Sequence, residues 1–386
     1  MKNDDWNKSV GANVGSGDGA DAPKPPVFKK ERDLDAARKA LEPWLCEKLD
    51  RTGVRILDFA VPAGAGVSNE TLLLTLDPGT GAGEALRECV VRIHPRPEYQ
   101  LFMNPEFELQ FQVLDTMYRN DLVKVSQTYW YEPDESLLGL PFFVVERLHG
   151  NVPVSMPVYN SGGWLYEATP AQRRIVWETA VAEFAKIHMV PTELFEFCDR
   201  PQWGKTGVEQ KINYWTHCLE WATHGQVPEI MLTIRQWLVD NVPSQLERSL
   251  AWGDARMGNM MFGPDFRLVG VNDWEQANLS GPMQDLGWWL FFDDYHSVDH
   301  NLPRLEGLGN RQETIDLWQD ITGMKAHDIH YYEVLSGYEL TILTLRTIDL
   351  ARSSGAMAVR PPLHFLYRTC AMLDLEVPAE YRPSNG

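Results

Sequence analysis

Hydrophobic positions recur along this chain with two different periods. Apolar side chains three to four positions apart predict a helix over 33–50, which Asp33 caps and which Pro43 kinks or splits. The same spacing predicts a second helix over 106–118. Short runs rich in Val, Ile, Leu and Phe predict strands. These runs occupy 54–59, 70–76, 89–94, 123–131 and 141–148, with a Gly-rich turn at 77–83.

Beyond residue 150 the spacing is mainly helical. Helices are predicted at 170–188, 208–223, 228–241, 311–322 and 328–351. A hairpin interrupts them within 250–274, where two short strands flank a Gly-Pro-Asp-Phe turn.

The order of these elements predicts the fold class. We expect an α+β, two-lobed protein-kinase-like fold. A flexible tail would cover 1–32, a small β-rich N-terminal lobe 33–148, and a larger, mainly helical C-terminal lobe 149–386. This layout is typical of kinases, but layout alone does not assign an activity.

The composition excludes several classes of protein. The chain has 386 residues, of which 44% are hydrophobic and 14 are Trp, so it is not mainly disordered and has enough length for about two lobes. The net charge of −19 gives nucleic acid and anionic membranes no overall attraction to the chain. We therefore expect neither of them as a partner.

Cysteine usage and the terminal sequence bear on location. The five Cys include no Cys-x-x-Cys pair, which is usual in a reducing compartment. The N-terminus has no apolar segment of the signal-peptide kind, and the apolar run at 286–292 is far shorter than the ~20 residues of a membrane helix. We expect a cytoplasmic protein that is a monomer or a homodimer.

The residues with the clearest chemistry lie within 252–286. Asp254 and Asn259 are five positions apart, and Asp273 follows fourteen positions later, across the predicted hairpin. Phosphoryl transfer uses these side chains: one carboxylate takes the proton of the acceptor hydroxyl, while an amide oxygen and a second carboxylate hold Mg²⁺ against the nucleotide phosphates. Arg256 follows closely enough to neutralise charge on the transferred group.

This segment resembles the aminoglycoside phosphotransferase family. The family pattern is His-Gly-Asp-x4-Asn, then Asp-Trp-Glu, then Gly-x-Pro-x2-Asp-Leu. Residues 252–259 read Trp-Gly-Asp-Ala-Arg-Met-Gly-Asn, which is most similar to the actinobacterial and acyl-CoA-dehydrogenase-associated branch. The resemblance extends over about 35–375. It implies a kinase-like enzyme that uses ATP and Mg²⁺ to phosphorylate a hydroxyl of a small molecule.

The resemblance also implies a role for each residue of the segment. Asp254 and Arg256 would be catalytic, with Asp254 as the base. Asn259 and Asp273 would be the Mg²⁺ ligands. Asp285 would be structural and would brace the catalytic loop.

The N-terminal lobe is where the resemblance implies that ATP binds. The stretch Gly-Ala-Gly-Val-Ser-Asn-Glu-Thr at 64–71 offers backbone N–H groups to phosphate near Ser68 and Asn69. Taken alone, a Gly-rich turn between two strands is more often a plain hairpin.

Two further nucleotide contacts are implied. Arg92 lies where kinases carry a phosphate-binding Lys, and its guanidinium would clamp phosphate there, unless it is a solvated strand cation. The adenine would bind the backbone of the interlobe linker, between Glu146 and Leu148.

The chain departs from the family pattern at two positions. Trp252 replaces the usual His, which is a scaffold residue, so the chemistry remains possible. Gln110 takes the place of the Glu that pairs with the phosphate-binding cation. Glu106 or Glu108 would replace it only in a different helix register, because positions 108 and 110 lie about 200° apart on a helix. At position 110 the sequence therefore supplies no carboxylate for an ion pair with Arg92.

Three interpretations of function follow. The first is phosphorylation of an aminoglycoside-like or other hydroxylated metabolite, which suits the negative charge. The second is a hydroxyacyl-CoA kinase, whose anionic substrate would need a local basic rim. The third is a kinase-like binding module without turnover, suggested by Trp252 and Gln110 but disfavoured by the intact base and metal ligands. Glu275 assists at the metal or substrate, or is structural. His188, Trp288 and Trp289 are interpreted as buried packing residues.

Overall fold

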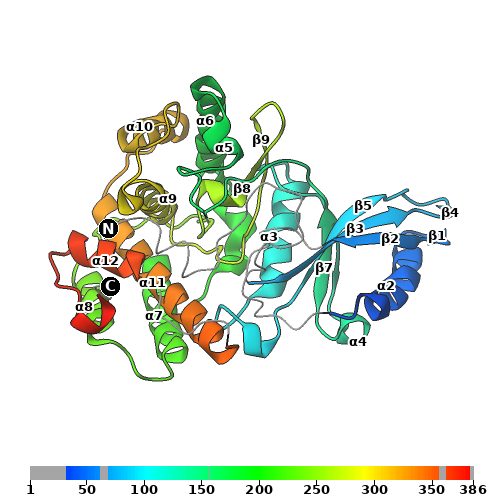
Figure 1. Ribbon diagram of the computed structural model, residues 1–386, viewed down its shortest axis with the longest axis horizontal. Helices are drawn as coiled ribbons and strands as arrows, with labels where there is room; N and C mark the ends of the chain where they lie inside the picture. Colours follow the sequence, from blue (N-terminus) through cyan, green and yellow to red (C-terminus); the bar gives the residue numbers. More distant parts are fainter. Residues whose placement is uncertain (1–31, 61–67, 156, 356–361, 383–386) are drawn as a thin grey trace.

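A computed structural model describes residues 32–60, 68–155, 157–355 and 362–382 and shows two lobes (Figure 1). The predicted α+β, two-lobed architecture is confirmed, with a β-rich small lobe and a helical large lobe. Apart from Arg32, the predicted tail lies outside the described residues, as do residues 64–67 of the Gly-rich stretch.

The small lobe contains a five-stranded antiparallel sheet in the order β2-β3-β5-β7-β6. The strands are β2 (Arg55–Ala60), β3 (Glu70–Asp77), β5 (Glu88–Ile93), β6 (Thr128–Glu132) and β7 (Phe142–Glu146). A small separate pair is formed by β1 (Arg51–Thr52) and β4 (Thr80–Gly81). The segment predicted to be only a turn therefore contains a short strand.

Two helices cover opposite faces of this sheet (Figure 1). They are α2 (Leu34–Lys48) and α3 (Phe107–Arg119). Successive side chains of a strand point to opposite faces, so Phe142 packs with the α2 side chains and Phe143 with those of α3. The α3 side chains belong to the same hydrophobic cluster as the helical lobe. Helix α3 therefore packs against both lobes.

The large lobe is built around α11, which packs against α7, α8, α9 and α12. The long helices are α6 (Pro170–Ile187), α7 (Gly207–Ala222), α8 (Glu229–Asp240), α9 (Pro282–His296), α10 (Arg311–Thr322), α11 (Ile329–Ser353) and α12 (His364–Met372). Short helical segments are α4 (Glu135–Leu138), α5 (Trp164–Glu167), η1 (Pro97–Tyr99), η2 (Thr192–Cys198), η3 (Met257–Asn259), η4 (Val298–His300) and η5 (Ala379–Tyr381). The hairpin of β8 (Met260–Phe262) and β9 (Leu268–Val271) faces the small lobe. Within the described ranges, no helix has the length and apolarity needed to cross a membrane.

Several predicted elements need correction. Helix α2 is capped by Asp33 as predicted, but it continues through Pro43 as one element. Its apolar face, which includes Leu41 and Leu45, is buried against the sheet, and this packing outweighs the one hydrogen bond that proline removes. Helices α9 and α12 have no counterpart in the sequence pattern, since α9 is buried on nearly all sides and lacks a polar face.

Candidate active site

Asp285, near the start of α9, holds the candidate catalytic loop, residues 252–259, through its carboxylate. The carboxylate accepts the backbone N–H of Trp252 at 2.6 Å and that of Gly253 at 2.8 Å. It also lies 3.1 Å from His188 Nε2, while His188 Nδ1 accepts the indole N–H of Trp318 at 2.8 Å. Because Nδ1 is an acceptor, the ring proton is on Nε2 and points to Asp285. All five residues are buried, so this end of the loop is fixed.

Gly253 brings the catalytic loop into contact with residues 275–278. Its φ is +91°, and a Cβ there would lie 2.2 Å from the carbonyl oxygen of Gln276. Next to it, Ala251 and Asn278 exchange two backbone hydrogen bonds of 2.8 and 3.1 Å. Only glycine fits this conformation and this contact. Steric constraints thus require the glycine of the Trp-Gly-Asp motif.

Trp252 links the catalytic loop to the segment that carries Asp273. The side chain is fully buried, and its indole N–H points to the carbonyl oxygens of Asn272 and Asp273, each at 3.0 Å. Asp273 has φ +55°, a left-handed conformation that non-glycine residues rarely adopt. The tryptophan therefore has a structural role, in line with the scaffold role that the family resemblance implies for this position.

Asp254 is surrounded by three N–H donors. Its Oδ1 accepts from Arg256 Nε at 3.0 Å and from the indole of Trp288 at 2.9 Å. Its Oδ2 accepts from Asn259 Nδ2 at 2.6 Å. Each carboxylate oxygen has two lone pairs, so Oδ2 keeps one acceptor position for a further O–H donor. The arrangement fixes the side chain without using up its capacity to accept.

Arg256 is held between Asp254 and a second chain of polar groups, which begins at Ser155. Its NH1 donates to Ser155 Oγ at 3.1 Å, and its guanidinium lies 5.3 Å from the ring centre of Phe292. Ser155 Oγ lies 3.1 Å from His296 Nε2, while His296 Nδ1 lies 2.7 Å from the carbonyl oxygen of Phe292. A carbonyl only accepts, so Nδ1 carries the proton and Nε2 accepts from the serine. Burial lowers the pKa of His296 to about 3, which keeps the ring neutral.

Asn259 and Asp273 are brought together by the β8–β9 hairpin. The N–H of Asn272 donates to the carbonyl of Asn259 at 2.8 Å, which places Asp273 next to it. Asn259 uses its Nδ2 on Asp254, so its Oδ1 is left for another partner. An amide oxygen and a carboxylate are the oxygen donors that Mg²⁺ prefers, and phosphates and water complete such a site. The residues therefore fit Mg²⁺. No cluster of three His, Cys, Asp or Glu side chains suited to a metal occurs among the described residues, and a site of this type needs none.

Arg92 pairs with Asp273 and has no carboxylate from α3 beside it. Both terminal nitrogens of its guanidinium lie 3.0 Å from Asp273 Oδ1. Its Nε is buried without a hydrogen-bond partner among the described residues. Gln110 does face this region from α3, whereas Glu108 is exposed, as the helix register required.

Gln110 and Glu275 both contact Asn69 at the start of β3. The Nδ2 of Asn69 donates to Gln110 Oε1 at 3.3 Å and to Glu275 Oε2 at 3.1 Å. Burial chiefly, and the neighbouring Asp273, raise the pKa of the Glu275 carboxyl to about 7, while Arg92 and the Ser68 hydroxyl act in the opposite direction. Ser68 and Asn69 are both buried. Residues from three separate segments therefore meet beside the proposed metal ligands.

The interlobe linker runs against the β8–β9 hairpin. The Glu146 side chain accepts the backbone N–H of Gln127 at 3.1 Å and so supports the start of β6. Leu148 packs against Gly270, where a Cβ would come within 2.3 Å of Leu148 Cδ1. The linker backbone between them remains the part that an adenine could contact.

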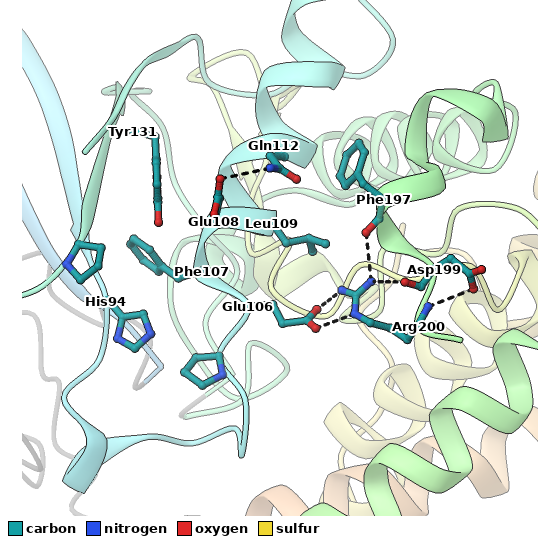
Figure 2. A pocket seen from close by; sticks show the side chains of 12 residues that line it. His94, Glu106, Phe107, Glu108, Leu109, Gln112, Tyr131, Phe197, Asp199 and Arg200 are labelled. Carbon is teal, nitrogen blue, oxygen red and sulfur yellow. Dashed lines mark hydrogen bonds and ion pairs between the residues drawn. The ribbon is translucent and has the colours of Figure 1, made fainter. Parts of the chain in front are cut away.

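Two hollows lie on the α3 side of the site. One is a partly enclosed cavity of about 70 Å³ beside Glu275 and Gln276, with room for only a few water molecules. Its wall includes Trp203, Tyr214 and Trp215, so Trp215 is both buried and at a cavity. The other is an open hollow over the start of α3 (Figure 2). Neither is large enough and closed enough to be a preformed acceptor pocket.

Several functional candidates were not found by sequence reasoning. Trp288 was interpreted only as a packing residue; it is fully buried and also donates to Asp254. Ser155 and His296 were not considered at all. Their contacts span more than 100 residues of chain, and no local spacing reveals them.

The family model described as phosphotransferase enzyme family matches residues 60–318 of this chain. The chain belongs to this phosphotransferase family. The match includes the whole segment from Trp252 to Asp285, so the geometry described above lies within the matched region.

Curated relatives of this family member are much longer proteins. Probable acyl-CoA dehydrogenase IBR3 of Arabidopsis thaliana is 24% identical over 235 residues, which cover 58% of this chain and 27% of that protein. Acyl-CoA dehydrogenase family member 11 of Homo sapiens is 26% identical over 164 residues, which cover 42% of this chain and 20% of that protein. The chain therefore matches only a minor part of each relative's length.

Solved structures share the fold of this phosphotransferase family member. A putative aminoglycoside phosphotransferase from Ralstonia eutropha is similar with a TM-score of 0.60 and 22% identity, covering 86% of this chain and 95% of that one. Aminoglycoside phosphotransferase APH(4)-Ia, in a ternary complex with ADP and hygromycin B, has a TM-score of 0.53 and 14% identity, covering 87% of this chain and 98% of that one. At these identities the similarity establishes the fold alone.

Proposed function

We propose that this chain is an ATP- and Mg²⁺-dependent kinase that transfers the γ-phosphoryl group to a hydroxyl of a small molecule. The observation that carries the proposal is the meeting of Asp254, Asn259 and Asp273, two of them joined by a 2.6 Å hydrogen bond. Membership of a phosphotransferase family supports the reaction class. The ADP bound by APH(4)-Ia, which has the same fold, supports a nucleotide donor.

Asp254 would align the acceptor hydroxyl. The remaining acceptor position on Oδ2 is available for the hydroxyl proton, while Arg256 and Trp288 hold Oδ1. Phosphoryl transfer passes through a loose transition state, so orientation of the nucleophile matters more than early proton removal. The hydroxyl proton ends on Asp254 as the oxygen–phosphorus bond forms.

Arg92, Asn259 and Asp273 would hold the donor side. When bound, Mg²⁺ supplies charge neutralisation for the phosphate oxygens. The Arg92–Asp273 pair keeps two partly buried charges compensated when no nucleotide is bound. Phosphate oxygens would then accept hydrogen bonds from Arg92. The Asp273 carboxylate would thereby be freed to bind the metal. Ser68 and Asn69 would line the phosphate side from β3.

The acceptor has two candidate classes. An aminoglycoside or similar sugar is supported by the fold shared with aminoglycoside phosphotransferases. A hydroxyacyl-CoA is favoured by two observations of another kind. The matching relatives are acyl-CoA dehydrogenase family members. In addition, a cation, Arg256, adjoins the base, and the α9 carboxylates of Asp293 and Asp294 are each paired with arginine. Such pairing leaves less negative charge for a polycationic sugar.

Calorimetric titration of ATP into the protein, with and without Mg²⁺, tests the donor site first. Saturable binding that requires Mg²⁺ is expected. Release of ADP is then measured with a panel of aminoglycosides and a panel of hydroxyacyl-CoA thioesters. Absence of ATP binding in both conditions would contradict the proposal. Binding without turnover on any acceptor would favour a nucleotide-binding module.

A further inference from the structure

The ion pair between Glu106 and Arg200 joins the two lobes at the wall of the small cavity beside Glu275. Arg200 Nε donates to Glu106 Oε1 at 2.6 Å, and NH2 donates to the second carboxylate oxygen, so the contact has two parallel hydrogen bonds (Figure 2). Glu106 precedes the first residue of α3, and Arg200 follows η2 in the helical lobe. Bidentate Arg–carboxylate pairs are the geometrically most specific of ion pairs.

Arg200 is held in place by its own lobe. Its backbone N–H lies 3.0 Å from Asp199 Oδ1 and 3.1 Å from Gln210 Oε1, while Gln210 Nε2 donates back to Asp199 Oδ1 at 2.7 Å. Its side chain is 14% exposed, and the carbonyl of Phe197 also lies beside NH1. The Arg200 guanidinium is therefore fixed relative to the helical lobe. Through Glu106 it holds the start of α3.

Glu106 does not cap its own helix. As the residue before α3 it is placed to accept a first-turn N–H, yet its side chain makes no such bond and faces Arg200 instead. An acidic side chain at this end already suits the helix dipole. The Glu106 carboxylate therefore contacts the other lobe and does not cap α3.

Among the residues that the structure describes, no ion pair joins α3 to Arg92. Gln110 stands where a carboxylate would attract Arg92, and Arg92 is bound to Asp273. Gln110 lies one helical turn after Glu106, on the same face of α3. It contacts Asn69, which in turn contacts Glu275 beside the metal ligands. A shift of the start of α3 would therefore move the residues that face the nucleotide phosphates.

We propose that Glu106 and Arg200 are positioning residues, whose ion pair holds α3 on the helical lobe and, through Gln110, sets Asn69 and Glu275 for nucleotide binding. The proposal rests on the kinase function proposed above, because the placement of Asn69 and Glu275 matters for function only if a nucleotide binds beside them. The pair would hold α3 in place of the ion pair that a carboxylate at position 110 would form with Arg92.

The variants are Glu106→Gln, Arg200→Gln and the double variant, with Arg119→Met as a matched control. Arg119 forms an ion pair with Asp115 on the same helix, but its side chain is 70% exposed and the pair does not cross the lobes. Glu106→Gln keeps the size of the side chain and removes the charge. Two quantities are measured: amide hydrogen exchange over 107–113 in ligand-free protein, and the Kd for ATP with Mg²⁺ by calorimetry.

In Glu106→Gln we expect faster exchange in the first turns of α3 and a Kd for ATP raised by roughly three- to thirtyfold, the range for residues that act through a neighbour. The double variant should be no worse than either single variant, because all three break one contact. Arg119→Met should match the wild type in both measurements. Unchanged exchange, an unchanged Kd, or additive single effects would each overturn the proposal. Wild-type protein that binds no ATP would defeat the kinase function instead, and the exchange data would still decide whether the pair holds α3.

Discussion

The indole N–H of Trp252 lies 3.0 Å from the carbonyl oxygen of Asp273, a residue held at φ +55°. The backbone N–H of the same tryptophan is bound by Asp285. Trp252 therefore connects the loop that carries Asp254 to the segment that carries Asp273. The family's usual histidine has one ring N–H in its neutral form as well, but the larger indole also fills the space next to Trp274.

Trp252→Phe should lower the free energy of unfolding by about 1–3 kcal/mol, because two buried carbonyls lose their donor. Chemical denaturation measures this loss. Phosphoryl transfer should fall as well, since the conformation of Asp273 loses a support. A variant as stable and as active as the wild type would show that the indole contributes packing alone.

Asp254→Asn should reduce phosphoryl transfer by about 10²–10⁴-fold, the range for loss of a general base. The new amide group would also meet the N–H of Asn259, which now donates to the carboxylate. The protein should still fold, and ATP binding should persist. The matched control is Asp265→Asn, in the exposed turn of the same hairpin. Near-wild-type transfer by Asp254→Asn would remove this residue from the role of base.

Asp273→Asn should weaken the Mg²⁺ dependence of ATP binding. Loss of even an outer-shell partner costs roughly tenfold or more in metal affinity, and a direct ligand should cost at least as much. Calorimetry with and without Mg²⁺ measures the ratio of the two Kd values. The variant also deprives Arg92 of its ion pair, so ATP binding without metal should not weaken in parallel. An unchanged ratio would place the metal elsewhere.

His296 should make the protein less stable in acid. Burial lowers its pKa to about 3 from an ordinary value of 6.5, and Arg256 and His300 act in the same direction. Between these two pH values the unfolded chain binds more protons than the folded one. The stabilisation is therefore present above pH 6.5 and is lost as the pH falls toward 3, by at most about 1.4 kcal/mol per pH unit.

Comparison with His296→Gln isolates this contribution from that of other groups. Burial raises the pKa of Glu275 and Glu339 to about 7 and that of Asp293 to about 6, so these carboxyls change stability in the opposite sense. The difference in free energy of unfolding between wild type and His296→Gln should shrink from pH 6.5 downward. His330→Gln, at an exposed position, is the control. A pH-independent difference would mean that the ring is not kept neutral by folding.

The sequence predicted the two lobes and the hairpin that brings Asn259 and Asp273 together, because both depend on local order. Period and turn residues identify β3, α3 and α11, and the spacing from Asp254 to Asp273 follows from a short hairpin. Helix α9 was missed because both of its faces are buried, so its hydrophobic residues have no period.

Contacts between distant segments were beyond the sequence pattern. Glu106 and Arg200 are 94 positions apart, and Trp288 and Asp254 are 34 apart. The local pattern around Glu106 accounts for it as the residue before a helix, and that around Trp288 accounts for it as a packing residue. Neither pattern points to the distant partner. The Glu106–Arg200 ion pair and the Trp288–Asp254 hydrogen bond form only when the whole fold is assembled.

The chain of contacts from Trp318 through His188 to Asp285 has a consequence for mutagenesis screens. Trp318 belongs to α10, far along the chain from the catalytic loop, yet its indole fixes the tautomer of the histidine that faces Asp285. A substitution at Trp318 would thus lower turnover while every residue near the substrate remains intact. In a screen for inactive variants, Trp318 would be scored as part of the acceptor pocket, although it acts through the proton position of His188.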